Sequence, residues 1–193
     1  MPRTKEQFEE IRLEKAKMIK QVALELFANN GYYQTSISEI AKAANISKGL
    51  IYNYFESKDE LLRDIINSMI NEIYASFDRN HDGELTGDEF EFFVREAFRL
   101  QKEKREFYKM YYVLLMQPNI QEIINHASGE LMQNVMAITY QYFKKHFQDP
   151  ETEMLLYSSL VKGLSMQYVF APENFSDEIF EKAINRIIEF HKR

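Results

Sequence analysis

Two short helices joined by a tight turn between residues 35 and 55 constrain the fold of this chain more than any other feature. Ser36 followed by Glu39 forms a capping box, in which the hydroxyl and the carboxylate each accept a hydrogen bond from a free backbone N–H. Apolar residues then recur at helical spacing and can form one buried stripe: Ile37, Ile40, Ala41 and Ala44. Asn45 tolerates the left-handed backbone of a sharp turn, and Ser47 can cap a second helix. The stretch therefore predicts a helix, a turn and a helix.

A turn of three to four residues between two short helices is the helix-turn-helix arrangement, whose second helix enters the major groove of DNA. We expect this second helix to span residues 48–55, with Leu50, Ile51 and Phe55 available for a core. The run from about Ala23 to Leu62 resembles the N-terminal domain of TetR-type transcriptional regulators. This resemblance implies a homodimeric repressor that binds double-stranded operator DNA and is released by a small apolar or amphipathic effector.

The composition favours helices throughout the chain. Of the 193 residues, 45% are apolar, which is enough to bury one sizeable core or a small domain attached to a larger one. Only four prolines and six glycines occur, and apolar residues hardly ever alternate with period two. We therefore expect an all-α fold of about nine helices, with a three-helix head at residues 1–57 and a helical ligand-binding and dimerisation domain at residues 58–193.

The acidic residues are unevenly distributed, so the net charge of −6 is compatible with DNA binding. Residues 1–63 hold ten basic and nine acidic side chains, whereas residues 64–193 hold fourteen and twenty-one. No leader sequence and no apolar run of membrane-spanning length occur, and cysteine is absent. We expect a soluble cytoplasmic protein without disulfides. With no nucleophile motif and no phosphate-binding glycine loop, we do not expect an enzyme.

The polar residues around the two short helices are the candidate DNA contacts. By similarity to the family, six hydroxyl, phenol or ammonium donors are assigned to phosphate: Thr35, Ser36, Ser47, Tyr52, Tyr54 and Lys58. Three residues on the front of the second helix are assigned to the bases: Lys48, Gly49 and Asn53. The alternative interpretation is that the tyrosines only pack and the serines only cap helices.

The segment from Asp78 to Glu89 satisfies the spacing of an EF-hand calcium loop, with Gly83 at the bend. Its ligands would be the side chains of Asp78, Asn80, Asp82 and Glu89, the carbonyl of Glu84, and a hydroxyl or bound water at Thr86. Against calcium, EF-hands usually work in pairs and no second loop occurs here, and Asp, Asn and Gly are also common in surface turns. If calcium binds, it could control DNA affinity by fixing the angle between the two helices that flank the loop.

The remaining helices are rich in Phe, Tyr and Met, which suit an adaptable effector pocket but also an ordinary core. By resemblance, the last two helices, at about residues 150–170 and 176–191, would form a dimeric four-helix bundle; a monomeric core is the alternative. The competing function for the whole chain is an EF-hand calcium sensor or buffer in which the helix-turn-helix only packs.

Overall fold

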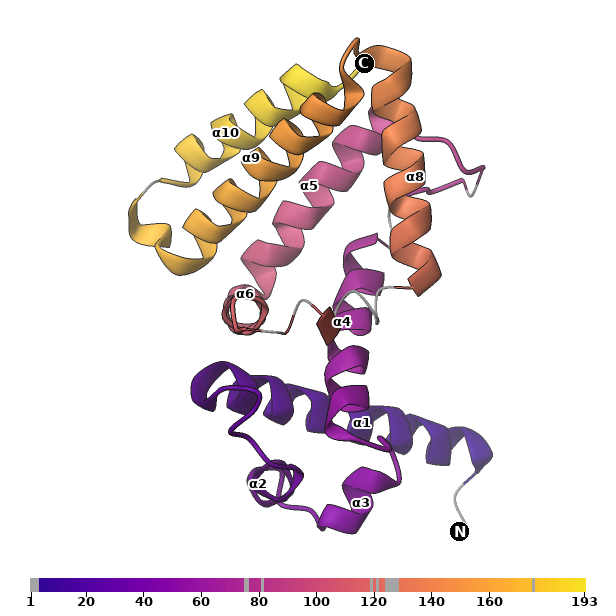
Figure 1. Cartoon of the computed structure of the whole chain (residues 1–193), viewed down its shortest axis with the longest axis vertical. Coiled ribbons are helices and arrows are strands. Elements are labelled where there is room, and N and C mark those ends of the chain that lie inside the picture. The colour runs from indigo at the N-terminus through magenta and orange to yellow at the C-terminus, as the bar shows by residue number, and fades with distance from the viewer. Residues whose placement is uncertain are drawn as a thin grey trace. The chain divides into compact units, whose positions relative to one another are not determined.

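The computed structural model describes residues 4–74, 77–80, 82–118, 120, 122–123, 129–174 and 176–193. Within these ranges the fold is all-α, as expected, with nine α-helices, one short 3-10 helix and no strand (Figure 1). The α-helices are α1 (Lys5–Asn30), α2 (Ile37–Ala43), α3 (Lys48–Tyr52), α4 (Lys58–Tyr74), α5 (Gly87–Glu103), α6 (Arg105–Leu115), α8 (Gly129–His146), α9 (Pro150–Phe170) and α10 (Asp177–His191), and the 3-10 helix η1 is Pro172–Asn174. None of the described helices is long and apolar enough to cross a membrane.

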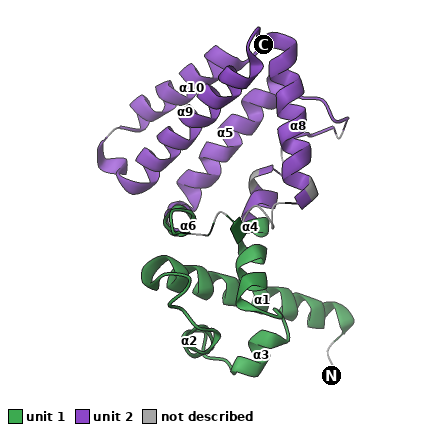
Figure 2. Ribbon diagram, viewed as in Figure 1, with its two compact units in different colours: residues 1–68, 110–127 green, residues 69–109, 128–193 purple. Residues whose placement is uncertain are grey.

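The chain divides into two compact units (Figure 2). Unit 1 comprises residues 1–68 and 110–127, and unit 2 comprises residues 69–109 and 128–193. This division differs from the single boundary at residue 57 that we expected from the sequence. The physical reason is that α4 contributes buried residues on both sides of residue 68. Helix α4 therefore belongs to the core of each unit and is not only a spacer.

Unit 1 is built around the apolar stripe of α1. Ile19, Ala23, Leu24 and Phe27 are fully buried. Most of the apolar residues predicted for the core of the two short helices are buried in the same unit, namely Ile37, Ile40, Ala41, Ile51 and Phe55, whereas Ala44 and Leu50 are half-buried. Lys20 of α1 forms an ion pair with Asp64 of α4 at 3.0 Å and donates a hydrogen bond to Ser68 at 2.7 Å. These contacts join α4 to α1 within the unit that holds the helix-turn-helix.

Unit 2 has an aromatic core contributed by α5, α8, α9 and α10. Phe90 stacks on Tyr142 with ring centroids 5.2 Å apart, and Phe98 meets Phe180 edge to face at 5.5 Å. The hydroxyl of Tyr142 donates to the carbonyl of His191 and accepts from the backbone N–H of Arg193, which fixes the C-terminal end of the chain to α8. The aromatic and methionine-rich composition therefore serves mainly as core, with the exception described below.

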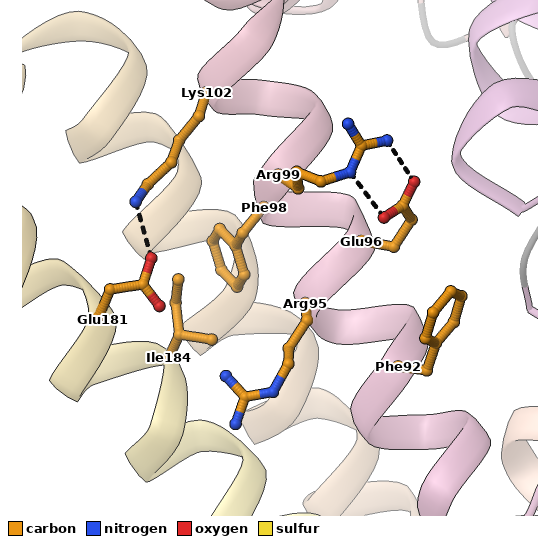
Figure 3. A pocket seen from close by; sticks show the side chains of 8 residues that line it. All are labelled: Phe92, Arg95, Glu96, Phe98, Arg99, Lys102, Glu181 and Ile184. Atoms are coloured by element: carbon orange, nitrogen blue, oxygen red, sulfur yellow. Dashed lines mark hydrogen bonds and ion pairs between the residues drawn. The ribbon is translucent and has the colours of Figure 1, made fainter.

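Charged side chains connect α5 to α10 at both ends. Lys102 reaches from α5 to Glu181 on α10 at 2.7 Å, beside a shallow groove also lined by Phe92, Arg95 and Arg99 (Figure 3). At the other end, Lys192 contacts Asp88 and Glu91 at 2.8 Å each. These partly exposed pairs orient the two helices and contribute little to stability beyond that.

Candidate functional site

The turn between α2 and α3 has the geometry that the sequence predicts. The hydroxyl of Ser36 accepts from the N–H of Glu39 at 3.2 Å, and the Glu39 carboxylate accepts from the N–H of Ser36 at 2.7 Å. The hydrogen bond from the backbone N–H of Ser36, with a further contribution from the Ser36 side chain, lowers the pKa of the Glu39 carboxyl. Asn45 has φ of 52°, and it is the only non-glycine residue with positive φ in the described part of the chain. The tight turn is therefore made by asparagine in the left-handed conformation.

The outer face of α3 carries the residues assigned to the bases. Lys48, Gly49 and Asn53 are all exposed, and Tyr52 beside them is 47% exposed. A Cβ placed on Gly49 would meet no atom within 4 Å, so the fold does not require glycine at this position. The absence of a side chain instead leaves the backbone accessible to a close partner.

Helix α3 is shorter than expected, because it ends at Tyr52 rather than Phe55. The N–H of Asn53 donates to the carbonyl of Leu50, and the N–H of Tyr54 donates to the carbonyl of Ile51. The residues that follow α3 therefore make the three-residue hydrogen bonds of a 3-10 helix. Phe55 is still buried, and Tyr54 is half-buried with its ring 6.4 Å from that of Phe55. Tyr54 thus packs through its ring.

Ser36 and Ser47 are exposed N-cap residues, and each uses its oxygen as an acceptor for a helix N–H. The Ser47 oxygen accepts from the N–H of Leu50 at 3.1 Å. Accepting this bond leaves the hydroxyl hydrogen free to donate. Capping and phosphate binding are therefore compatible roles for these two serines.

Thr35 and Lys58 differ from the expectation that they contact phosphate. Thr35 is only 2% exposed, and its hydroxyl donates inward to the carbonyl of Gly31 at 2.8 Å. The ammonium of Lys58 donates to the carbonyls of Tyr32 and Thr35 at 2.8 and 2.9 Å, with its nitrogen 4.4 Å from the centre of the Tyr32 ring. Both side chains therefore hold the turn between α1 and α2 in place. This is a tertiary role that the local sequence pattern did not indicate.

The same turn is fixed by residues that sequence reasoning missed. The N–H of Tyr32 donates to Gln117 Oε1 at 2.8 Å, and Gln117 Nε2 donates to the carbonyl of Phe27 at 2.7 Å. The buried Tyr32 hydroxyl donates a hydrogen bond to Asp59. Burial is the main cause that raises the pKa of Tyr32, and this hydrogen bond is the next. Gln117 lies far along the chain, and no local signal could have linked it to this turn.

Unit 2 contains a cavity of about 440 Å³ that is lined from α4, α5, α8 and α9. Its walls are aromatic, aliphatic and thioether groups with few polar atoms: Tyr74, Phe93, Val135, Met136, Thr139, Tyr140, Glu151, Met154, Leu155, Tyr157 and Ser158. Burial raises the pKa of Tyr74 and of Tyr157, and a hydrogen bond of 3.0 Å to Glu151 raises the pKa of Tyr140. These phenols are therefore neutral near pH 7, which leaves Glu151 as the charged group of the lining.

Comparison with known proteins identifies the N-terminal region. A family model described as bacterial regulatory proteins, tetR family, matches residues 19–65, which include α2, the turn and α3. The N-terminal region of the chain is therefore similar to the TetR family. Over 54 residues it is 54% identical to the uncharacterized HTH-type transcriptional regulator YuxN of Bacillus subtilis, an alignment that covers 28% of this chain and 19% of that protein.

Two solved structures extend the TetR-type fold over nearly the whole chain. NalD of Pseudomonas aeruginosa, the secondary repressor of the MexAB-OprM multidrug efflux pump, has a TM-score of 0.71 at 18% identity and covers 93% of this chain and 96% of its own. FadR of Bacillus subtilis in complex with stearoyl-CoA has a TM-score of 0.66 at 18% identity and covers 91% and 97%. At this identity the likeness shows the fold alone. The family model describes regulatory proteins, in line with the expectation that the chain is a DNA-binding regulator rather than an enzyme.

Proposed function

We propose that this protein is a sequence-specific DNA-binding repressor. The observation that carries the proposal is the exposed side of α3, where Lys48, Gly49 and Asn53 are accessible and no atom obstructs Gly49. Both short helices also begin at an exposed serine cap. Lysine donates to guanine and asparagine pairs with adenine in the major groove, whereas serine hydroxyls and helix N-termini suit phosphate. NalD, whose fold this chain shares, is itself a repressor.

Selection from a random duplex library, followed by affinity measurements at several salt concentrations, tests this proposal. A true operator complex loses affinity steeply with salt, with a slope of about 0.9 for each phosphate neutralised. Lys48→Met should lower specific affinity by about 1–3 kcal/mol and relax the preference at one base pair. Lys182→Met is the matched control, since this exposed lysine lies on α10 in unit 2. If no duplex is enriched at low salt, the protein is not a DNA-binding repressor.

We also propose that the protein acts as a homodimer through the outer faces of α9 and α10. Leu156 and Leu160 of α9 are 50% and 46% exposed, and Ile179 and Phe190 of α10 are 59% and 53% exposed. Large apolar groups repeated on two packed helices are typical of an interface with a second copy. Two helix-turn-helix domains are also needed to bind the two half-sites of an operator. Other apolar residues of α10 are buried in their own unit and are not available to a partner: Phe180, Ile184, Ile187 and Ile188.

Leu160→Glu should convert the dimer to a monomer in light scattering and weaken DNA binding. Ser159→Glu is the matched control, because it introduces the same charge at an adjacent exposed position of α9. A dimer that persists in Leu160→Glu would exclude this interface.

The effector is proposed to bind in the cavity of unit 2, because this cavity is mainly apolar and is lined by residues of four helices. FadR was solved with stearoyl-CoA, so a protein of this fold can bind a small molecule. The groove between α5 and α10 is less suitable, since its cations are paired with Glu91, Glu96, Glu103 and Glu181. Tyr157→Ala should enlarge the cavity and change which effector releases DNA, without changing the salt dependence of the apo complex.

Calcium binding at the loop from Asp78 to Glu89 is a further proposal, independent of the others. Gly83 has φ of 78°, and its N–H donates to Asp78 Oδ2 at 3.0 Å, so the loop is already bent. Asp78 Oδ1 is buried without a hydrogen-bond partner. However, Glu89 caps α5 through Thr86, and no three acidic or histidine side chains in the described ranges converge on one point. Binding therefore requires Glu89 to leave its cap.

Calorimetric titration with calcium tests the loop. Glu89→Gln should abolish binding, whereas Glu84→Gln should not, because position 7 of such a loop contributes only its backbone carbonyl. If calcium changes DNA affinity by some factor, DNA must change calcium affinity by the same factor. An unchanged titration in Glu89→Gln would exclude the site. Calcium binding without any DNA binding would instead support the sensor or buffer alternative.

A further inference from the structure

The cavity of unit 2 has the chemistry of a cation site. Tyr74 and Phe93 stack with centroids 5.4 Å apart, and Tyr140 and Tyr157 also line the cavity. The faces of aromatic rings carry negative electrostatic potential and attract cations. The thioethers of Met136 and Met154 are polarizable and adapt to the shape of an apolar ligand.

Among the described residues that line the cavity, Glu151 is the only ionisable side chain other than the phenols, and no Lys, Arg or His occurs there. Glu151 is exposed at the first turn of α9, and the hydroxyl of Tyr140 orients it from α8 through a hydrogen bond of 3.0 Å. An anionic ligand would therefore meet a fixed negative charge with no compensating cation. A ligand with one positive charge would meet a carboxylate and the aromatic rings that line the same cavity.

We propose that this cavity selects a hydrophobic cation, a bulky apolar molecule with one delocalised or quaternary positive charge, and that such a cation releases the protein from DNA. The second half of this statement rests on the repressor function proposed above. The apolar body of the ligand contacts Phe93, Val135 and Met154, and its charge lies toward Glu151. Charge sign, rather than size alone, then decides which molecules are effectors.

Tetraphenylphosphonium and tetraphenylborate are suitable probes, because they share the same four-ring shape and carry opposite charges. Calorimetry on the DNA-free protein should give about tenfold tighter binding of the cation, since attraction to Glu151 and the ring faces becomes repulsion for the anion. Equal or tighter binding of tetraphenylborate would overturn the proposal, as would the absence of binding by the cation.

Glu151→Gln should weaken binding of tetraphenylphosphonium about two- to fivefold and reduce its salt dependence, which is the range expected for an exposed charge. Glu173→Gln is the matched control, because Glu173 is an exposed carboxylate of unit 2 that does not line the cavity. Equal losses in the two variants would show a general effect of net charge and would overturn the assignment of Glu151.

DNA release is measured separately with the selected duplex. Loss of DNA affinity in proportion to cation occupancy supports the effector role. Unchanged DNA affinity with the cation bound refutes that role and leaves the repressor proposal standing. Absence of DNA binding altogether refutes the repressor proposal, whereas the calorimetric comparison of the two ions still tests the cation site.

Discussion

Replacing Lys58 by methionine separates a structural lysine from a DNA-binding one. In the wild-type protein the ammonium of Lys58 bonds to two carbonyls of the turn between α1 and α2 at 2.8 and 2.9 Å. Methionine keeps the apolar stem but removes the donors. A hydrogen bond to a charged group contributes about 1.5–3 kcal/mol, but Lys58 is partly exposed and water can replace part of this contribution.

We therefore expect Lys58→Met to lower the free energy of unfolding by about 1–2 kcal/mol. For a chain of this length that corresponds to a decrease in Tm of about 2–8 °C. Urea denaturation monitored by circular dichroism gives the first quantity, and calorimetry gives the second. Lys48→Met is the comparison, since Lys48 is exposed and makes no hydrogen bond or ion pair that the structure records; its stability should be unchanged.

The effects on DNA binding should be the reverse of the effects on stability: Lys48→Met should weaken specific DNA binding, whereas Lys58→Met should not. The salt slope of the complex should fall by about 0.9 for each lost phosphate contact, so a Lys58→Met protein that remains folded should keep the wild-type slope. If Lys58→Met were as stable as the wild type and its salt slope fell by about one, the ammonium would be a phosphate ligand. The assignment of Lys58 to the turn would then be wrong.

Substitutions at three further positions test the helix-turn-helix. Gly49→Ala should raise the free energy of unfolding by about 0.5–1 kcal/mol, because alanine favours helix and has open space, while specific DNA affinity falls; unchanged affinity would exclude close approach at this position. Asn45→Ala should lower stability by about 1–2 kcal/mol because of the positive φ, whereas Asn45→Gly should not, as urea titrations of both would show. Ser47→Ala should cost about 1 kcal/mol in the same assay through loss of the cap on α3.

The features that could be predicted from the sequence depend on neighbours along the chain. The capping box of Ser36 and Glu39 involves residues three apart, and the left-handed turn depends on Asn45 itself. The buried stripe of α2 follows from helical spacing. Such local patterns fix the conformation of the helix-turn-helix before any tertiary contact is considered, which is why the family resemblance was also visible there.

The features that could not be predicted depend on groups that only folding brings together. The inward hydrogen bonds of Thr35 and Lys58 need the carbonyls of the turn that follows α1, and Gln117 reaches that turn from 85 residues away. Similarly, nothing in the sequence around Glu151 indicates that Tyr140 would orient it, because the two residues lie on different helices. Hydroxyl and ammonium groups near a motif are candidates for function, and their partners in the fold decide which remain available.

Burial divides the apolar residues of the last two helices in a way that periodicity alone could not. On α10, Phe180 and Ile184 are buried in unit 2, whereas Ile179 and Phe190 are largely exposed. On α9, Val169 is buried while Leu156 and Leu160 are exposed. A helix that is apolar on two sides needs a second covering surface in addition to its own core. The alternatives of a monomeric core and a dimeric bundle are therefore not exclusive, because one set of residues forms the core and the other is left for a partner.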